Sequence, residues 1–343
     1  MLKNLKKLKF LFSQKQNKSI LFLSILLFLA MGFEIIGLGA ILPVISFVFD
    51  PSYANESQIF NFLGSYMVNY NSEFIIYLML LLIVFIYSFK TFFLVFLISK
   101  QNIFLTKLKA DLSSRLFSKY TYQSYSFHLQ NNSSKLLKII QVDVNHVNVY
   151  LTQLITIIVE SGLILSVVIT LIYIEPIGAI SIGIFFVAVS TLFFQLTKKR
   201  LAIWGKKMID LNENLSKNII EGLNGIKAFK ILGKEQEINN QFKKNNFNLA
   251  KIESNHLTTI QLPRFFLELI SIIGLTGFII LMFIQDKQSN QIIPVLSVFV
   301  AATFRMIPSI NRVIASLQNF KYYAASLDIV YNDFKTLNFD FKR

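Results

Sequence analysis

Residues 221–229 read EGLNGIKAF, and this glycine-containing stretch lies within a connection of about 65 residues, 198–263, between two strongly apolar segments. Gly222 and Gly225 favour a break in helical structure, because glycine readily adopts conformations that other residues avoid. The flanking sequence holds few Gly or Pro residues and has helical periodicity. We therefore expect two long helices that reverse direction at residues 221–229.

A second connection, 100–149, has the same character. Leucines recur at helical spacing from Leu105 to Leu116, and another apolar series follows residues 121–134. Asn and Ser side chains at 131–134 supply turn and N-cap groups. Helices of 20 to 25 residues would be roughly 30–37 Å long. Both connections are therefore predicted to be helical hairpins with a break at the tip.

The composition indicates a membrane protein. The 343 residues are 54% hydrophobic and only 15% charged, and the mean hydropathy is +0.54. A helix of about 20 apolar residues crosses a bilayer. The sequence predicts an all-α membrane protein with six long transmembrane helices and cytoplasmic helical extensions. The predicted spans cover about 20–49, 74–99, 150–174, 177–197, 265–285 and 292–317.

The distribution of Lys and Arg predicts the orientation. Of 34 such residues, 29 fall before the first span, after the last one or in the two long connections. The short connection 50–73 has none, the Glu175-Pro176 turn has none, and the loop near 286–291 has only Lys287. Cytoplasmic loops retain positive charge, so both termini are predicted on the cytoplasmic side of the cell (inner) membrane.

The excess of basic over acidic residues has a simple interpretation. A net charge of +15 suits loops that face anionic lipid headgroups, and we expect no nucleic-acid partner. Residues 1–18 are predicted to form an interfacial elbow helix that leads into a retained span, not a cleaved signal peptide. The six-span domain is expected over 19–335, and 336–343 would begin a linker.

Four basic residues fall inside or at the edge of spans: Lys90, Arg264, Arg305 and Arg312. From residue 292 near the outer face, Arg305 lies about 20 Å into a layer roughly 30 Å thick. An unpaired charge in mid-span costs at least about 2.5–3.5 kcal/mol, so each basic group should have a partner or reach water.

Three kinds of partner are open for these cations. The long side chains can extend to lipid headgroups. They can pair internally, since Arg264 and Glu268 are four residues apart and Glu34 or Glu160 can meet Lys90 or Arg305. They can also bind an anionic substrate headgroup, for which arginine is well suited. The four are our candidate substrate-binding residues.

Pro308 lies between Arg305 and Arg312 in the sixth predicted span. It lacks a backbone N–H and is expected to kink that helix. The kink can serve as a hinge during transport, or it can be a packing feature.

Patterns for catalysis and metal binding are missing from the sequence. It has no G-x-x-x-x-G-K-[ST] phosphate loop, no cysteine, and three histidines, His128, His146 and His256, without metal-ligand spacing. We expect neither a catalytic site nor a metal site.

The layout resembles the transmembrane domain of ABC exporters. EGLNGIKAFKILGKEQEINNQF (221–242) and YTYQSYSFHLQNNSSKLLKIIQVDVNHV (120–147) are similar to the second and first intracellular loops of that family. FVAATFRMIPSINRVIASLQNFKYYAASLDIVYNDF (299–334) and QLPRFFLELI (261–270) look like the exporters that flip lipid-linked oligosaccharides. The resemblance covers nearly the whole chain.

This resemblance implies a homodimer that works with ABC nucleotide-binding domains, which bind ATP and Mg and are expected on a further segment or a separate polypeptide. It also implies a substrate such as a lipid-linked oligosaccharide or another anionic amphiphile. The hairpin tips would couple to those domains. The residues assigned to coupling are Tyr122, Tyr125, Phe127, Gly222, Gly225, Ile226 and Phe229.

Three alternatives remain at this stage. The tip aromatics can pack within their own hairpin instead of binding a partner. The chain can serve an exporter of another lipid or a peptide, with Arg305 in an internal ion pair. It can also be an ATP-independent carrier or a membrane scaffold, although we see no inverted repeat with interrupted helices.

Overall fold

The computed structural model describes residues 2–49, 72–174, 176–284 and 289–337. They form helices joined by short turns. The predicted outer connections at 50–73, 175–176 and 286–291 lie wholly or partly outside these residues. The elements are α1 (Leu2–Leu11), α2 (Gln14–Phe49), α4 (Ser72–Thr121), α5 (Tyr125–Gln130), α6 (Ser133–Lys138), η2 (Ile139–Asp143), α7 (Val144–Ile174), α8 (Pro176–Asn224), α9 (Ile226–Leu232), α10 (Glu235–Ile284) and α11 (Ser289–Thr336).

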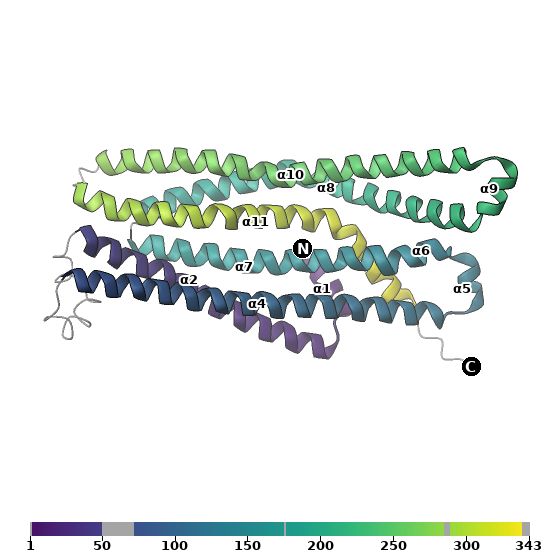
Figure 1. Cartoon of the computed structure of the whole chain (residues 1–343), viewed down its shortest axis with the longest axis horizontal. Helices are drawn as coiled ribbons and strands as arrows, with labels where there is room; N and C mark the ends of the chain where they lie inside the picture. The colour runs from purple at the N-terminus through teal and green to yellow at the C-terminus, as the bar shows by residue number, and fades with distance from the viewer. Residues whose placement is uncertain (1, 50–71, 175, 285–288, 338–343) are drawn as a thin grey trace.

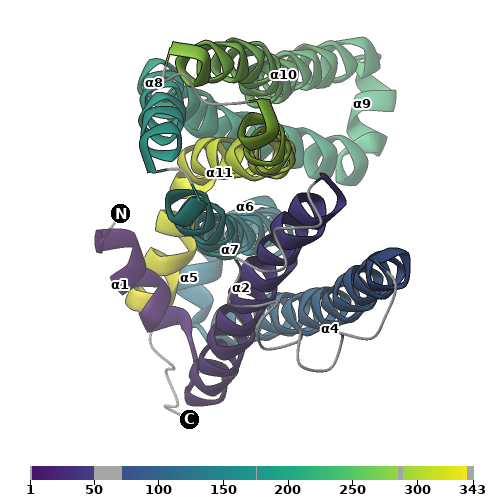
Figure 2. The same cartoon turned by 90° about the vertical axis from the view of Figure 1, so that its left-hand side faces the viewer.

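The long helices run side by side along the long axis of the molecule (Figure 1). In the end view, α11 lies between the α8–α10 pair and the group formed by α2, α4 and α7 (Figure 2). It contacts α7, α8, α10 and α2. This helix is therefore the central element of the bundle.

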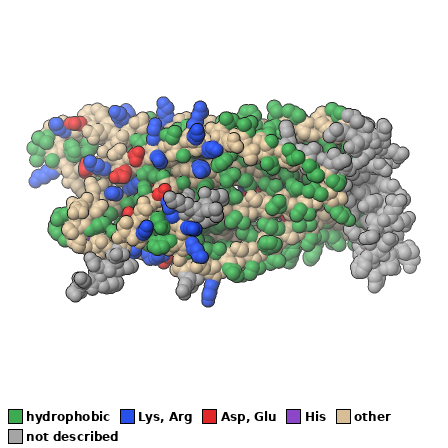
Figure 3. Space-filling view, turned by 180° about the vertical axis from the view of Figure 1, so that it is seen from behind, with side chains coloured by type: hydrophobic (Ala, Val, Ile, Leu, Met, Phe, Trp, Pro, Cys, Tyr) green, Lys and Arg blue, Asp and Glu red, His purple; other side chains and the backbone are tan. Residues whose placement is uncertain are grey.

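Four helical segments in the described residues are long and apolar enough to cross a membrane: Gln16–Gly37, Ile76–Thr121, Ser133–Tyr173 and Glu235–Ile280. On the face shown in Figure 3, hydrophobic side chains cover one half, while charged side chains gather over the other half. On α4, Leu81, Phe85 and Phe92 are 71%, 68% and 78% exposed. Such large exposed side chains are typical of a surface that faces lipid.

Both predicted hairpins are present. The first turns through α5 and α6 between α4 and α7, and the second turns through α9 between α8 and α10 (Figure 1). The Asn132 side chain accepts a hydrogen bond from the Ser134 amide at 3.0 Å, which confirms the predicted N-cap. Gly225 precedes α9, and Gly233 ends it with φ of 62°. That left-handed conformation favours glycine.

The amino-terminal break differs from the prediction. The elbow helix α1 ends at Leu11, and residues 14–18 already belong to α2. Ser13 and Gln16 explain the position, because they form a reciprocal capping box. The Ser13 amide donates to Gln16 Oε1 at 2.7 Å, and the Gln16 amide donates to Ser13 Oγ at 3.4 Å.

A large core lies where α1, α4, α7 and α11 meet beyond the apolar half of the molecule. Leu108, Leu112 and Leu116 of α4 are 1% exposed or less and pack there with Tyr150. Within this core the helix after α6 passes through a π-helical turn, Ile139–Asp143. The sequence periodicity did not indicate that turn.

Two features of α11 are its continuity through Pro308 and its close approach to α8. It continues through Pro308 without interruption, so the expected kink does not break the helix. A Cβ atom added at Gly205 of α8 would overlap the backbone carbonyl of Tyr322 on α11. Backbone cannot move aside as a flexible side chain can, and glycine is therefore required for this approach of α8 to α11.

We predict that Gly205→Ala destabilises the protein by about 1–3 kcal/mol, because the added methyl group forces α8 and α11 apart. The matched control is Gly274→Ala on α10, where a Cβ meets nothing within 4 Å. Thermal unfolding in detergent should show a lower midpoint for the first variant alone. Equal midpoints for the two variants would contradict the packing argument.

Candidate functional site

Glu34 joins three helices through one buried carboxylate. Its side chain, on α2, is 1% exposed. The Lys90 ammonium on α4 lies 2.9 Å from Glu34 Oε2. The Arg305 guanidinium on α11 donates to Glu34 Oε1 at 2.6 Å and to Oε2 at 3.1 Å. This fork geometry is the strong form of an arginine–carboxylate pair.

A second ion pair lies two helical turns farther along α11. Arg312 donates from Nη2 to Glu160 Oε2 at 3.2 Å, and its Nε lies 2.6 Å from Oε1. Glu160 comes from α7, so this pair joins α11 to α7. Glu160 also attracts Arg305 electrostatically. We refer to Glu34, Lys90, Glu160, Arg305 and Arg312 as the charge cluster.

The charge cluster is not neutral. It holds three cations and two carboxylates, which leaves one net positive charge. The side chains of Lys90 and Glu160 are each 9% exposed, whereas those of Arg305 and Arg312 are 32% and 47% exposed. The two arginines can therefore still meet another molecule, while Lys90 is enclosed against Glu34.

Arg264 forms a separate pair. Its Nε donates to Glu268 Oε1 at 2.9 Å, one turn along α10, and the two side chains are 66% and 48% exposed. All four basic residues are thus internally paired in this structure. The partners of Lys90, Arg264 and Arg305 are among those considered from the sequence. The pairing of Arg312 with Glu160 was not among them. Contact of these four basic residues with a substrate stays a prediction.

An apolar cavity of about 680 Å³ involves two of the helices that carry the charge cluster, α7 and α11. It is lined by α7, α8 and α11, with Ile164, Val168, Val187, Met306 and Val313 among its walls. Ile164 is one helical turn beyond Glu160, and Val313 follows Arg312 directly. No charged side chain of the described residues lines the cavity itself, but members of the charge cluster lie within one helical turn of its wall along α7 and α11. A hydrocarbon cavity with charged groups nearby suits an amphiphilic ligand.

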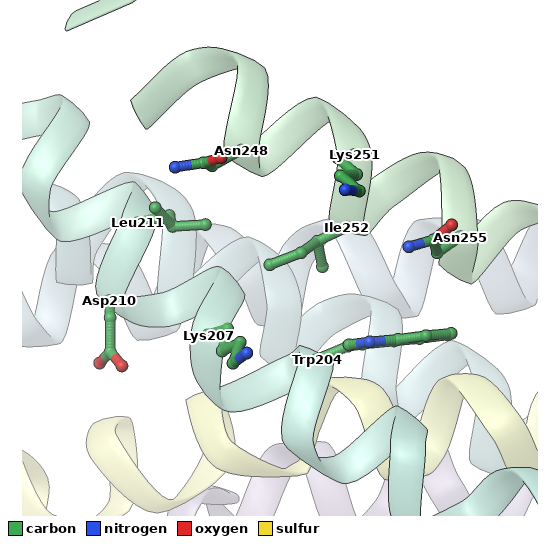
Figure 4. Close-up of a pocket in the computed structure, with 8 residues that line it drawn as sticks. All are labelled: Trp204, Lys207, Asp210, Leu211, Asn248, Lys251, Ile252 and Asn255. Atoms are coloured by element: carbon green, nitrogen blue, oxygen red, sulfur yellow. The ribbon is translucent and has the colours of Figure 1, made fainter. Parts of the chain in front are cut away.

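A second recess, of about 540 Å³, lies between α8 and α10 on their extensions beyond the predicted spans. Leu211 and Ile252 project between the two helices, whereas Asp210 points away from α10 (Figure 4). Lys207, Lys251 and Trp204 complete most of the wall. It contains no nucleophile beside a general base, and we assign no chemistry to it.

The hairpin tips present a mixture of exposed and packed residues. Tyr122 and Tyr125 are 56% and 77% exposed, and Ile226 is 46% exposed. Phe127, in contrast, stacks on Tyr120 with ring centres 6.2 Å apart. Packing within the hairpin therefore applies to Phe127, and the exposed tip residues are available to a partner.

In the second tip, Gly222 and Phe229 are partly buried. A Cβ at Gly222 would meet Ile238 of α10 at 3.3 Å, and one at Gly225 would meet the Phe229 ring at the same distance. Gly222 thus lets α8 approach α10 near the tip, and Gly225 leaves room for the Phe229 ring where α9 begins. They position the tip, and Ile226 is one of its exposed apolar side chains, with Leu223, Ile231 and Leu232.

The histidines do not form a site together. His128 is exposed, and His146 lies 3.1 Å from Ser326 Oγ. The His256 ring stacks on Tyr322 at 3.7 Å between ring centres, and burial raises the pKa of the Tyr322 phenol. Among the described residues no group of three or more His, Cys, Asp or Glu side chains could hold a metal ion.

Comparisons with known proteins agree with this architecture. The family described as ABC transporter transmembrane region matches residues 19–306. A solved structure, of a bacterial Atm1-family ABC exporter with ATP bound, superposes with a TM-score of 0.66 at 12% sequence identity. The match covers 93% of this chain and 54% of that chain. At this identity the likeness concerns the fold.

We predict that Glu34→Gln destabilises the protein by about 3 kcal/mol or more, because Lys90 and Arg305 would lose the buried carboxylate with which both form ion pairs. Glu160→Gln should cost less, since Arg312 is nearly half exposed and can reach water. Chemical or thermal unfolding of the purified variants measures the difference. The double variant Glu34→Gln/Arg305→Gln should recover part of the lost stability. If its loss equals the sum of the losses in the two single variants, that result would count against the pairing.

Proposed function

The chain belongs to the family of ABC transporter transmembrane regions, and we propose that it is the membrane part of an exporter that moves an anionic amphiphile. As a multi-pass membrane protein it would span the bilayer six times, through α2, α4, α7, α8, α10 and α11, with both termini in the cytoplasm. Two copies would pair, and nucleotide-binding domains would supply the energy of ATP, bound with Mg.

The observation that supports this substrate class is the charge cluster beside an apolar cavity. One net positive charge remains after the internal pairs are counted, and it lies at the depth predicted for the inner leaflet. A phosphate or pyrophosphate headgroup offers oxygens that arginine binds in bidentate fashion. The cavity of about 680 Å³ offers hydrocarbon walls for the tail.

We assign different roles to the four basic residues. Arg312 and Arg305 would contact the headgroup, because their side chains are partly exposed. Lys90 would act as a positioning residue that offsets the charge of Glu34, so that the Arg305 charge is not cancelled. Arg264 would attract the substrate at the membrane border. Pro308, between the two arginines, would let α11 bend as the cavity changes its access.

Within this class, a lipid-linked oligosaccharide is the substrate that the sequence resemblance favours. Its pyrophosphate would meet the arginines, and its sugars would occupy the aqueous part of the dimer interior. An exporter of another lipid or a peptide is the second candidate. The observation in its favour is that each arginine of the cluster already has a carboxylate partner.

Coupling to the nucleotide-binding domains would use the exposed tips of the two hairpins. Tyr122, Tyr125 and Ile226 would contact those domains, because large exposed apolar and aromatic side chains are typical centres of protein interfaces. The long extensions of α4, α7, α8 and α10 would carry the motion to the charge cluster as stiff helices.

We predict that Arg312→Gln lowers the stimulation of ATP hydrolysis by an anionic lipid-linked substrate about tenfold or more, with little loss of stability. The amide of the replacement side chain can still donate a hydrogen bond to Glu160, which limits the loss of stability, and the thermal midpoint measures that loss separately. The assay uses the chain assembled with its nucleotide-binding domains in proteoliposomes, with Lys199→Gln on α8 as the control. Full stimulation in the Arg312 variant would remove the substrate assignment.

A second prediction concerns the tips. Tyr125→Ala and Ile226→Ala should weaken binding of the nucleotide-binding domain at least fivefold, while the thermal midpoint of the chain stays unchanged. Phe127→Ala is the contrasting variant, because its ring packs on Tyr120 and its loss should lower the midpoint. Pull-down or calorimetric titration measures the binding. Normal binding by both exposed-tip variants would show that the tips do not couple.

A further inference from the structure

A third cavity lies away from the charge cluster, between the amino end of α2 and the middle of α4. Its volume is about 560 Å³. In Figure 1 the two helices cross at an angle. The amino end of α2, which follows the turn after α1, diverges from α4. The cavity occupies this divergence, and the capping box of Ser13 and Gln16 forms part of its wall.

Three lysines line this cavity: Lys18 on α2, with Lys100 and Lys107 on α4. All three are exposed, and none of them is within ion-pair distance of a carboxylate among the described residues. The Lys100 ammonium lies 5.1 Å from the centre of the Phe96 ring, one turn toward the membrane. The cavity therefore has a surplus of positive charge.

One carboxylate, Asp111, also lines the cavity. It accepts a hydrogen bond from Gln16 Nε2 at 3.0 Å and one from Arg115 at 3.3 Å. Arg115 offsets its charge, so that Asp111 does not cancel the three lysines. The charge of the cavity thus suits an anion.

The remaining walls are apolar and follow the expected membrane border. The first predicted span begins at about residue 20 and the second ends at 99, so Lys18 and Lys100 flank the cytoplasmic edge of the bilayer. Phe22 and Leu23 line the cavity on the membrane side of that edge. Phe104 contributes a partly buried ring. A ligand here would meet ammonium groups and hydrocarbon within one site.

We propose that this cavity binds an anionic phospholipid of the cytoplasmic leaflet. The lipid phosphate lies among Lys18, Lys100 and Lys107, and an acyl chain lies against Phe22 and Leu23. Basic pockets at this depth between membrane helices suit anionic headgroups. Bound there, the lipid bridges α2 and α4 and holds the junction between α1 and α2 in place. This site is independent of the proposed transport substrate.

The test compares lipid binding to the full chain in nanodiscs or detergent by native mass spectrometry. Lys18→Gln/Lys100→Gln/Lys107→Gln should bind phosphatidylglycerol about tenfold or more weakly than the unchanged chain. The control Lys198→Gln/Lys199→Gln/Arg200→Gln removes three charges at the corresponding border of α8 and should lose less than twofold. Phosphatidylcholine should bind weakly to all three proteins.

An equal loss of phosphatidylglycerol binding in the two triple variants would overturn the site. It would show that the lipid is attracted by the number of positive charges and not by this cavity. Competition by glycerol 3-phosphate would show a site for free phosphate and would also overturn the lipid assignment. If the triple-lysine variant folds poorly, a second measurement tests the site in a chain that keeps all three lysines. In Phe104→Trp/Trp204→Phe, brominated phosphatidylglycerol should quench fluorescence more strongly than brominated phosphatidylcholine, and equal quenching would contradict the proposal.

Discussion

The carboxylate of Glu34 is the group on which the membrane half of the structure depends. It is almost fully buried, and a lone charge in such a place would be expensive. Lys90 at 2.9 Å and Arg305 at 2.6 Å supply the necessary partners from two other helices. Because both cations must reach one carboxylate, the relative rotation and depth of α2, α4 and α11 are restricted together. The same contact leaves the cluster with an excess of positive charge.

From this contact, α11 links the apolar half of the molecule to the half that carries the hairpins. Arg312 holds it to α7, and its carboxyl end meets the end of α4 beside the first hairpin. There the Lys119 ammonium donates to the carbonyl oxygens of Phe334 and Leu337 at 2.8 and 2.6 Å, and the Tyr120 hydroxyl donates to Asp333 at 2.5 Å. Polar contacts and the packed core thus both join the first hairpin to α11.

Sequence patterns predicted the hairpins well, because their signals are local. The side chain of Asn132 caps a helix, Gly225 favours a turn through its backbone, and helical periodicity predicts the two arms of each hairpin. The capping box at Ser13 is also local, and the S-x-x-Q spacing would have indicated the end of α1. The approach at Gly205 was different, because it depends on a backbone carbonyl more than 100 residues away.

The candidate site was predictable in its residue types but not in its pairing. Burial of Arg305 in an apolar run required some partner, and Glu34 was among those considered. Glu34 pairs with both Lys90 and Arg305 only because α2, α4 and α11 are rotated so that these side chains meet. No local sequence pattern predicts that rotation. The same limit applies to the cavity at Lys18 and Lys100, since only the crossing of α2 and α4 brings those lysines together.

The most direct measurement is the affinity of the full chain, in nanodiscs, for two amphiphiles with identical tails. One carries a phosphate or pyrophosphate headgroup and the other an uncharged hydroxyl headgroup, and both are tested in the triple-lysine variant, which removes the second lipid site. A net positive cluster beside an apolar cavity predicts that the charged amphiphile binds at least tenfold more tightly, and that Arg312→Gln abolishes most of this preference. Equal affinity for the two headgroups would contradict the account.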